Sequence, residues 1–107
     1  MITDKLTNPI VKAAIDALQK GDQKIWNNLF TSDAALYDDG SPRDLASFSK
    51  SALGHERFTS IDKIENDGLD IYGHFHSDQW GDFKTYFKFT INAGQKISRL
   101  DIGQATY

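Results

Sequence analysis

Residues 82–105 read DFKTYFKFTINAGQKISRLDIGQA and carry the clearest structural signal in the chain. Apolar and polar side chains alternate over the first ten of these residues, as in a β-strand that buries one face. Asn92–Gln95 has the composition of a turn, after which the chain returns as a second strand. If this turn has four residues, Leu100 lies opposite Phe87, so the stretch predicts an antiparallel hairpin.

A second hairpin is expected just before this one. Asp67-Gly68 is a strong signal for a two-residue turn, and it separates strands expected at residues 57–66 and 69–76. With that turn, Ile61 lies opposite His74. A slip of one residue would exchange the two sheet faces, so the face assignment depends on both turns.

The two hairpins together assign each strand residue to one of two faces. The inner face is mostly apolar and comprises Phe58, Asp62, Ile64, Leu69, Ile71, Gly73, Phe75, Phe83, Thr85, Phe87, Phe89, Leu100, Ile102 and Gln104. The outer face is polar and aromatic and comprises Tyr72, His74, His76, Lys84, Tyr86, Lys88, Arg99 and Asp101.

The first half of the sequence is helical in character. Asn8-Pro9 is a helix start, because an N-cap side chain precedes a proline at the first helical position. Gly21 ends this helix and Asp22 caps a second one. Ser41-Pro42 repeats the start signal for a third helix, which ends at Gly54. Three N-terminal helices followed by strands predict an α+β fold, with the helices packed on a mainly antiparallel sheet.

Composition limits the class of protein. A length of 107 residues suits a single domain spanning residues 1–107, and the absence of cysteine excludes disulfides and thiolate chemistry. A net charge of −3 gives no basic patch for nucleic acid or a membrane surface. The sequence has neither a long apolar run nor a secretory signal at its N-terminus, so a cytoplasmic protein is expected.

Several short motifs indicate which protein family the sequence resembles. They are Ala17-Leu18-x-x-Gly21-Asp22, Leu29-Phe30-x-x-Asp33-Ala34, Asp38 with Gly40, Phe87-x-Phe89 and Lys96-Ile97. Together with the order of elements, they resemble the nuclear transport factor 2-like superfamily, which includes ketosteroid isomerase and SnoaL-type polyketide cyclases. The resemblance implies a cystatin-like cone, in which helices and a curved sheet enclose an apolar pocket and the convex sheet face often forms a dimer. It implies no particular reaction, because this fold hosts many unrelated activities.

The resemblance places Asp38 at the position of the general-base aspartate of the ketosteroid isomerases. A carboxylate facing an apolar pocket has its charged form disfavoured, which raises its pKa toward useful basicity. Taken alone, Asp38-Asp39-Gly40 favours an aspartate-rich turn, and with the resemblance both interpretations stay open. The oxyanion-hole tyrosine and acid of those isomerases match Ala14 and Thr85 here, and neither side chain is an acidic donor. This departure argues against steroid isomerisation.

Two further titratable residues are catalytic candidates. In the expected register Asp62 faces the pocket opposite Gly73, whereas a register error would move it to the surface. His55 follows the third helix, where it either stabilises the helix end as a cation or lines the pocket mouth as a proton carrier.

The pocket wall is expected to come from the helices and the inner sheet face. Helical spacing favours the core over a cofactor site for Trp26 and Phe30. Trp80 in its Ser-Asp-Gln-Trp-Gly loop could close the pocket or pack across a dimer. The candidate ligand-binding residues are Trp26, Phe30, Phe48, Phe75, Trp80, Phe83, Thr85, Phe87, Leu100, Ile102 and Gln104.

The outer sheet face predicts a homodimer, because Tyr, His and Arg are enriched at interfaces. The candidate dimer residues are Tyr72, His74, His76, Tyr86 and Arg99. His74 and His76 point to one face, but a metal site would need a third ligand and a cleft, so neither a metal nor a cofactor is expected.

Three functions remain open from the sequence. The first is a domain that binds a small hydrophobic molecule in an apolar pocket. The second is an isomerase, cyclase or hydratase-type enzyme, with Asp38 as the general base acting on a small carbonyl compound. The third is a protein-interaction module that uses the outer sheet face. The missing oxyanion donors favour binding over catalysis.

Overall fold

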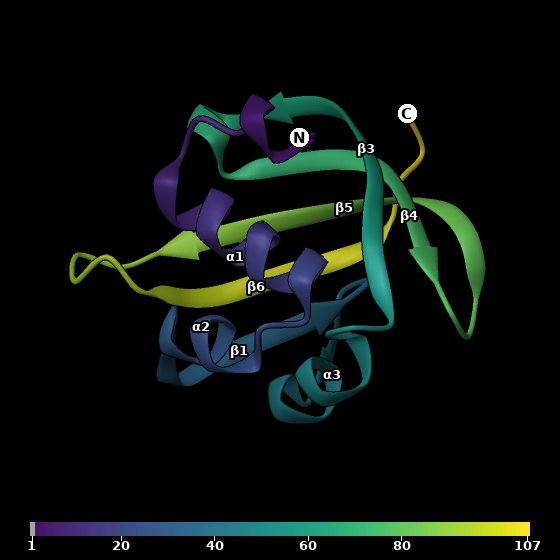
Figure 1. Cartoon of the computed structure of the whole chain (residues 1–107). Coiled ribbons are helices and arrows are strands. Elements are labelled where there is room, and N and C mark those ends of the chain that lie inside the picture. The colour runs from purple at the N-terminus through teal and green to yellow at the C-terminus, as the bar shows by residue number, and fades with distance from the viewer. Residues whose placement is uncertain (1) are drawn as a thin grey trace.

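The computed structural model describes residues 2–107 and places one six-stranded sheet behind a layer of helices (Figure 1). The helices are α1 (Pro9–Lys20), α2 (Gln23–Asn28) and α3 (Leu45–Ala52), with 3₁₀ turns η1 (Ile2–Lys5) and η2 (Asn66–Gly68). The strands are β1 (Phe30–Asp38), β2 (Ser41–Arg43), β3 (Glu56–Glu65), β4 (Asp70–Ser77), β5 (Gly81–Ile91) and β6 (Ile97–Gln104). Their order in the sheet is β2-β1-β6-β5-β4-β3.

The α+β class is confirmed, and the sheet is mixed. β1 pairs with β6 in parallel, whereas the other neighbouring strands are antiparallel. The expectation that all three helices precede the strands is wrong for α3, because β1 and β2 come before it in the chain. α1 lies across the inner face of the sheet, and α3 lies near the end of β1 (Figure 1).

Helix α1 begins and ends where the sequence predicts. The Asn8 side chain accepts hydrogen bonds from the backbone N–H groups of Ile10 and Val11, at 2.9 and 3.1 Å. Gly21 ends the helix with a φ of 71°, a conformation that costs glycine little. Asp22 then caps α2 through the N–H of Ile25.

The start of α3 differs from the prediction. Ser41 and Pro42 belong to β2, an edge strand, where a residue without an N–H group is tolerated. The cap of α3 is Asp44, whose carboxylate accepts from the N–H and the hydroxyl of Ser47, at 3.0 and 2.7 Å. Asp39-Gly40 is the two-residue turn between β1 and β2, with φ of 50° and 86°.

Strand β3 departs from regular pairing at two points. The register against β4 shifts between Phe58 and Ser60 and again between Ile61 and Lys63, so one extra β3 residue is accommodated at each point. The second shift places Ile61 opposite Gly73 in the core, rather than opposite His74 as expected. The prediction that Asp62 faces the pocket is therefore wrong, because the bulge turns its side chain to the outer face.

The C-terminal hairpin keeps its predicted faces despite a different register. Leu100 lies opposite Phe89 rather than Phe87, an offset of two residues. An even offset leaves inward side chains pointing inward, so the inner face of β5 and β6 is confirmed. Part of the offset arises at Ser98, which is skipped between the pairs Ile91–Ile97 and Thr90–Arg99.

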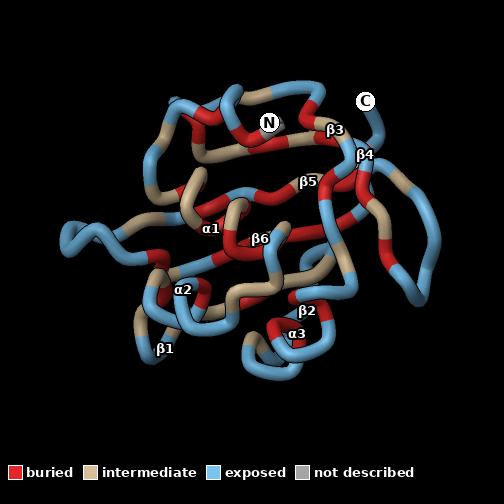
Figure 2. The backbone as a smooth tube through the Cα atoms, in the orientation of Figure 1, coloured by how far each residue is buried: buried red, intermediate tan, exposed pale blue. Residues whose placement is uncertain are grey.

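The core lies between α1 and the inner face of the sheet, where buried positions run along α1 and the central strands (Figure 2). Among residues 2–107, no helix has both the length and the apolar character needed to cross a membrane.

Candidate functional site

A cavity of about 480 Å³ opens between the inner face of the sheet and α3. Its apolar wall consists of Phe48 from α3, Phe75 from β4, Phe83 and Phe87 from β5, and Ile102 from β6. Phe75 packs on Phe83 and Phe87 with ring centroids 5.8 and 5.6 Å apart. β4 and β5 thus supply a continuous aromatic surface, which Ile102 of β6 extends, because alternate residues of each strand face the same side.

Two polar residues of the predicted wall also line this cavity, namely Thr85 and Gln104. The Thr85 hydroxyl donates to the backbone oxygen of Gly103 at 2.6 Å, so its proton is already engaged. The Gln104 side chain makes no hydrogen bond within residues 2–107. Its amide is therefore available to a bound molecule.

Asp38 stands in the cavity wall as the resemblance implies, and it has a partner that the sequence analysis missed. Asp38 and Leu36 share the inner side of β1, and Arg43 lies opposite Leu36 on β2. The Arg43 guanidinium donates to Asp38 Oδ2 at 2.9 Å, and its carbon lies 5.0 Å from the centre of the Phe48 ring. The Asp38 side chain is 37% exposed, so it is an ion-paired carboxylate at the mouth rather than an isolated one in an apolar wall.

Glu56 is a second residue of the mouth that the sequence analysis missed. It begins β3, on the same side of the strand as Phe58, and its Oε2 accepts from the hydroxyl of the buried Ser77 at 3.0 Å. Asp39 also stands at the rim, where Oδ1 accepts from the backbone N–H of Gln104 at 3.2 Å. The mouth of the cavity is therefore polar while its wall is aromatic.

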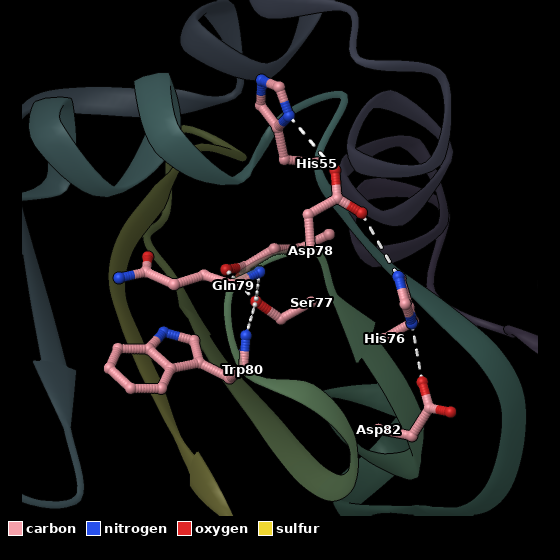
Figure 3. Close-up of polar contacts among 8 residues, drawn as sticks. His55, His76, Ser77, Asp78, Gln79, Trp80 and Asp82 are labelled. Atoms are coloured by element: carbon pink, nitrogen blue, oxygen red, sulfur yellow. Dashed lines mark hydrogen bonds and ion pairs between the residues drawn. The ribbon is translucent and has the colours of Figure 1, made fainter.

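Trp80 lies at the tip of the β4–β5 hairpin, beside the cavity, and is 71% exposed. Ser77 organises this tip, because its hydroxyl oxygen accepts from the N–H groups of Gln79 and Trp80, at 3.3 and 3.2 Å (Figure 3). The indole turns to the opposite side of the hairpin from His76 and Asp82 (Figure 3). An exposed indole on an ordered tip can close over a molecule in the cavity.

Neither His76 nor His55 lines the cavity. His76 Nδ1 lies 2.7 Å from Asp82, and its Nε2 lies 3.2 Å from Asp78 (Figure 3). Because both ring nitrogens face carboxylates, Asp82 first and then Asp78 raise the pKa of His76, while burial and Arg57 oppose the rise. His55 is exposed, and its Nδ1 lies 3.3 Å from Asp78 Oδ2. It lines a separate hollow outside the cavity wall. The alternative that placed His55 at the mouth is therefore wrong.

Asp62 belongs to a cluster on the outer face. It accepts from the Tyr107 hydroxyl and from Ser60, and it contacts His74 Nδ1 at 2.7 Å. The Tyr107 hydrogen bond is the main cause that lowers the pKa of Asp62, and burial with that same contact raises the pKa of Tyr107 to about 12. Asp62 and Asp38 therefore lie on different faces and share no cavity.

The remaining predicted wall residues lie elsewhere. Trp26 and Phe30 line a second hollow, of about 510 Å³, beside β1 and α3, and their rings are 4.9 Å apart. Leu100 is buried in the core. The helical spacing of Trp26 and Phe30 favours the core, and both are buried residues of the core cluster.

The outer face gathers the five candidate dimer residues. Lys88 lies 5.2 Å from the ring centre of Tyr86 and 5.9 Å from that of Tyr72, and Arg99 lies 4.0 Å from that of Tyr37. Burial, followed by the charge of Asp39, raises the pKa of Tyr86. His74 and His76 share this face, and no group of three metal-ligating side chains among residues 2–107 is arranged to hold a metal ion.

The sequence matches no protein-family model, and the comparison with curated proteins also gives no match. Solved structures are similar in shape. A protein of unknown function with a cystatin-like fold from Xanthomonas campestris superposes with a TM-score of 0.69, at 18% identity, over 99% of this chain and 92% of its own. The chain has the cystatin-like fold of the nuclear transport factor 2-like proteins.

Two other solved structures share this cystatin-like fold. A protein from Sinorhizobium meliloti, provisionally described as a polyketide cyclase, gives a TM-score of 0.73 at 19% identity over 95% of this chain and 99% of that one. The orange carotenoid protein of Anabaena, which binds canthaxanthin, gives 0.72 at 18% identity over 91% of this chain but only 35% of its own. At such identities the likeness establishes the cystatin-like fold and not the activity.

Proposed function

We propose that the chain binds a small, mainly apolar molecule in the cavity between α3 and the sheet. The observation that carries this proposal is that Phe48, Phe75, Phe83 and Phe87 line one cavity of about 480 Å³. That volume and lining suit a small ligand, since such sites are mostly apolar with few polar groups. The Anabaena protein, 35% of which superposes on this chain, binds canthaxanthin, an apolar carotenoid.

Filling the cavity should abolish binding. The neutral fluorophore N-phenyl-1-naphthylamine is expected to bind the wild type and to brighten as it leaves water. Gln104→Trp places a large ring at the cavity, so the fluorescence increase should fall at least about tenfold at fixed probe concentration. Lys24→Trp, on the exposed side of α2, is the matched control and should bind as the wild type does. Equal binding by Gln104→Trp, or no binding by the wild type, would contradict the proposal.

Catalysis with Asp38 as the base is the second candidate. It is supported by the position of Asp38 at the cavity and by the provisional description of the Sinorhizobium meliloti protein. Two contacts favour binding over this alternative. Arg43 donates a hydrogen bond to Asp38 Oδ2. The Thr85 hydroxyl donates to the Gly103 oxygen, so Thr85 offers no donor to a developing oxyanion.

We also propose that two copies associate through the outer face. No helix of residues 2–107 covers this face, and the half-buried rings of Tyr72 and Tyr86 both lie close to Lys88. Sedimentation at micromolar protein should give a species of ~24 kDa, twice the mass of one chain. Tyr86→Glu should shift it to one chain mass, because the interface would lose an aromatic ring and would have to desolvate a carboxylate near Asp39 and Asp101. A wild type at ~12 kDa would refute the dimer and leave a partner protein as the alternative occupant of this face.

A further inference from the structure

The charges at the mouth of the cavity are unbalanced. Three carboxylates, from Asp38, Asp39 and Glu56, stand against one guanidinium, that of Arg43. Arg43 is already paired with Asp38 at 2.9 Å. Glu56 and Asp39 accept hydrogen bonds from neutral groups, and neither has an ion-pair partner within the part of the chain that the structure describes. The mouth therefore presents unneutralised negative charge.

The aromatic wall also favours a positively charged group in the cavity. An aromatic ring attracts a cation to its face, and the Phe48 ring already holds the Arg43 guanidinium, 5.0 Å from its centre. Trp80, the side chain best suited to this contact, is exposed beside the same mouth and makes no side-chain hydrogen bond within residues 2–107. The indole is thus free to cover the polar end of a bound molecule.

We infer that the cavity selects apolar molecules that carry an amine, and that it disfavours apolar carboxylic acids of the same shape. This inference rests on the proposed binding function and names the chemical class of the ligand. The hydrocarbon body would lie against Phe75, Phe83 and Phe87. The ammonium end would stand at the mouth, where Glu56 can accept from it and Trp80 can cover it. A carboxylate in that place would face Glu56 and Asp39 without a free cation to offset the repulsion.

Three probes with one ring system separate charge from shape. They are 2-naphthylmethylamine, 2-naphthalenemethanol and 2-naphthoic acid, which at pH 7 are cationic, neutral and anionic. Titration calorimetry should rank their affinities in that order, with the amine at least about tenfold tighter than the acid. The difference should shrink as salt is raised, because the mouth is open to solvent.

The two glutamates of the chain provide a matched pair of variants, since they lie at opposite ends of β3. Glu56→Gln retains an acceptor for Ser77 and should lower amine affinity several-fold while leaving alcohol affinity unchanged. Glu65→Gln removes the same charge from an exposed residue that pairs with Lys63, away from the cavity, and should change neither.

The outcomes separate this inference from the proposed function. Binding of the alcohol with equal affinity for amine and acid would overturn the amine preference and leave the cavity a binding site. An unchanged amine affinity in Glu56→Gln would also overturn it. Failure of all three probes to bind would overturn both proposals.

Discussion

Replacing Gly73 with alanine should destabilise the protein by about 3 kcal/mol, the upper end of the range for overpacking a core. The added methyl carbon would lie 2.0 Å from the backbone oxygen of Ser60 and 3.1 Å from the ring of Phe58. Ser60 cannot move freely, because it stands between the two bulges that curve β3 over β4. The expected result is a large fall in the midpoint of urea unfolding.

Gly94→Ala is the control for this change. Gly94 lies in the β5–β6 turn, where an added methyl would meet only the Asn92 side chain at 3.4 Å. It should shift stability by no more than about 0.5 kcal/mol, as exposed substitutions usually do. If Gly73→Ala is equally mild, the close approach of β3 to β4 does not constrain the sheet.

Trp26→Ala should cost about 3–5 kcal/mol, the usual loss for deleting a large buried aromatic side chain. Trp26 is 0% exposed, packs on Phe30, and donates its indole N–H to Ser49 Oγ at 2.8 Å. Ser49 in turn donates to the Leu45 oxygen at 2.7 Å, so the indole ties α2 to α3. Since α3 carries Phe48, binding of N-phenyl-1-naphthylamine should weaken together with stability.

The neighbouring Ile25 provides the control, because it occupies the same helix and is 49% exposed. Ile25→Ala should be close to neutral, and Trp26→Phe should lose less than Trp26→Ala because most of the ring volume remains. Both variants are measured by the same urea titration. Equal losses for Ile25→Ala and Trp26→Ala would show that α2 contributes little to the core.

Local sequence signals predicted the structure correctly where one residue determines the conformation of the backbone next to it. Asn8, Gly21 and Asp22 cap helices as expected, since each acts on residues within a few positions. The bulges in β3 had no such signal, because they depend on how β3 meets β4. The parallel pairing of β1 with β6 joins strands far apart in the sequence, which no local pattern reports.

The candidate site was predictable to the extent that the sheet faces were. Phe83, Phe87 and Ile102 share one face as predicted because the register error in the last hairpin was an even number of residues, and Phe75 lies opposite Phe83 on that face. Arg43 was missed for a particular reason. Ser41-Pro42 was interpreted as a helix start, although Asp39-Gly40 carries the same hairpin signal as Asp67-Gly68 and would have placed Arg43 beside Asp38.

The place of β6 in the sheet has a consequence for how the cavity comes into being. β6 is the last of the six strands in chain order, yet it lies between β1, which carries Asp38, and β5, which carries Phe83 and Phe87. Pairing of such distant segments closes long loops and slows folding. During translation β1 and β5 therefore have no strand to join them until β6 emerges. The cavity is a late product of folding, and a nascent chain lacking β6 would expose the apolar sides of both walls.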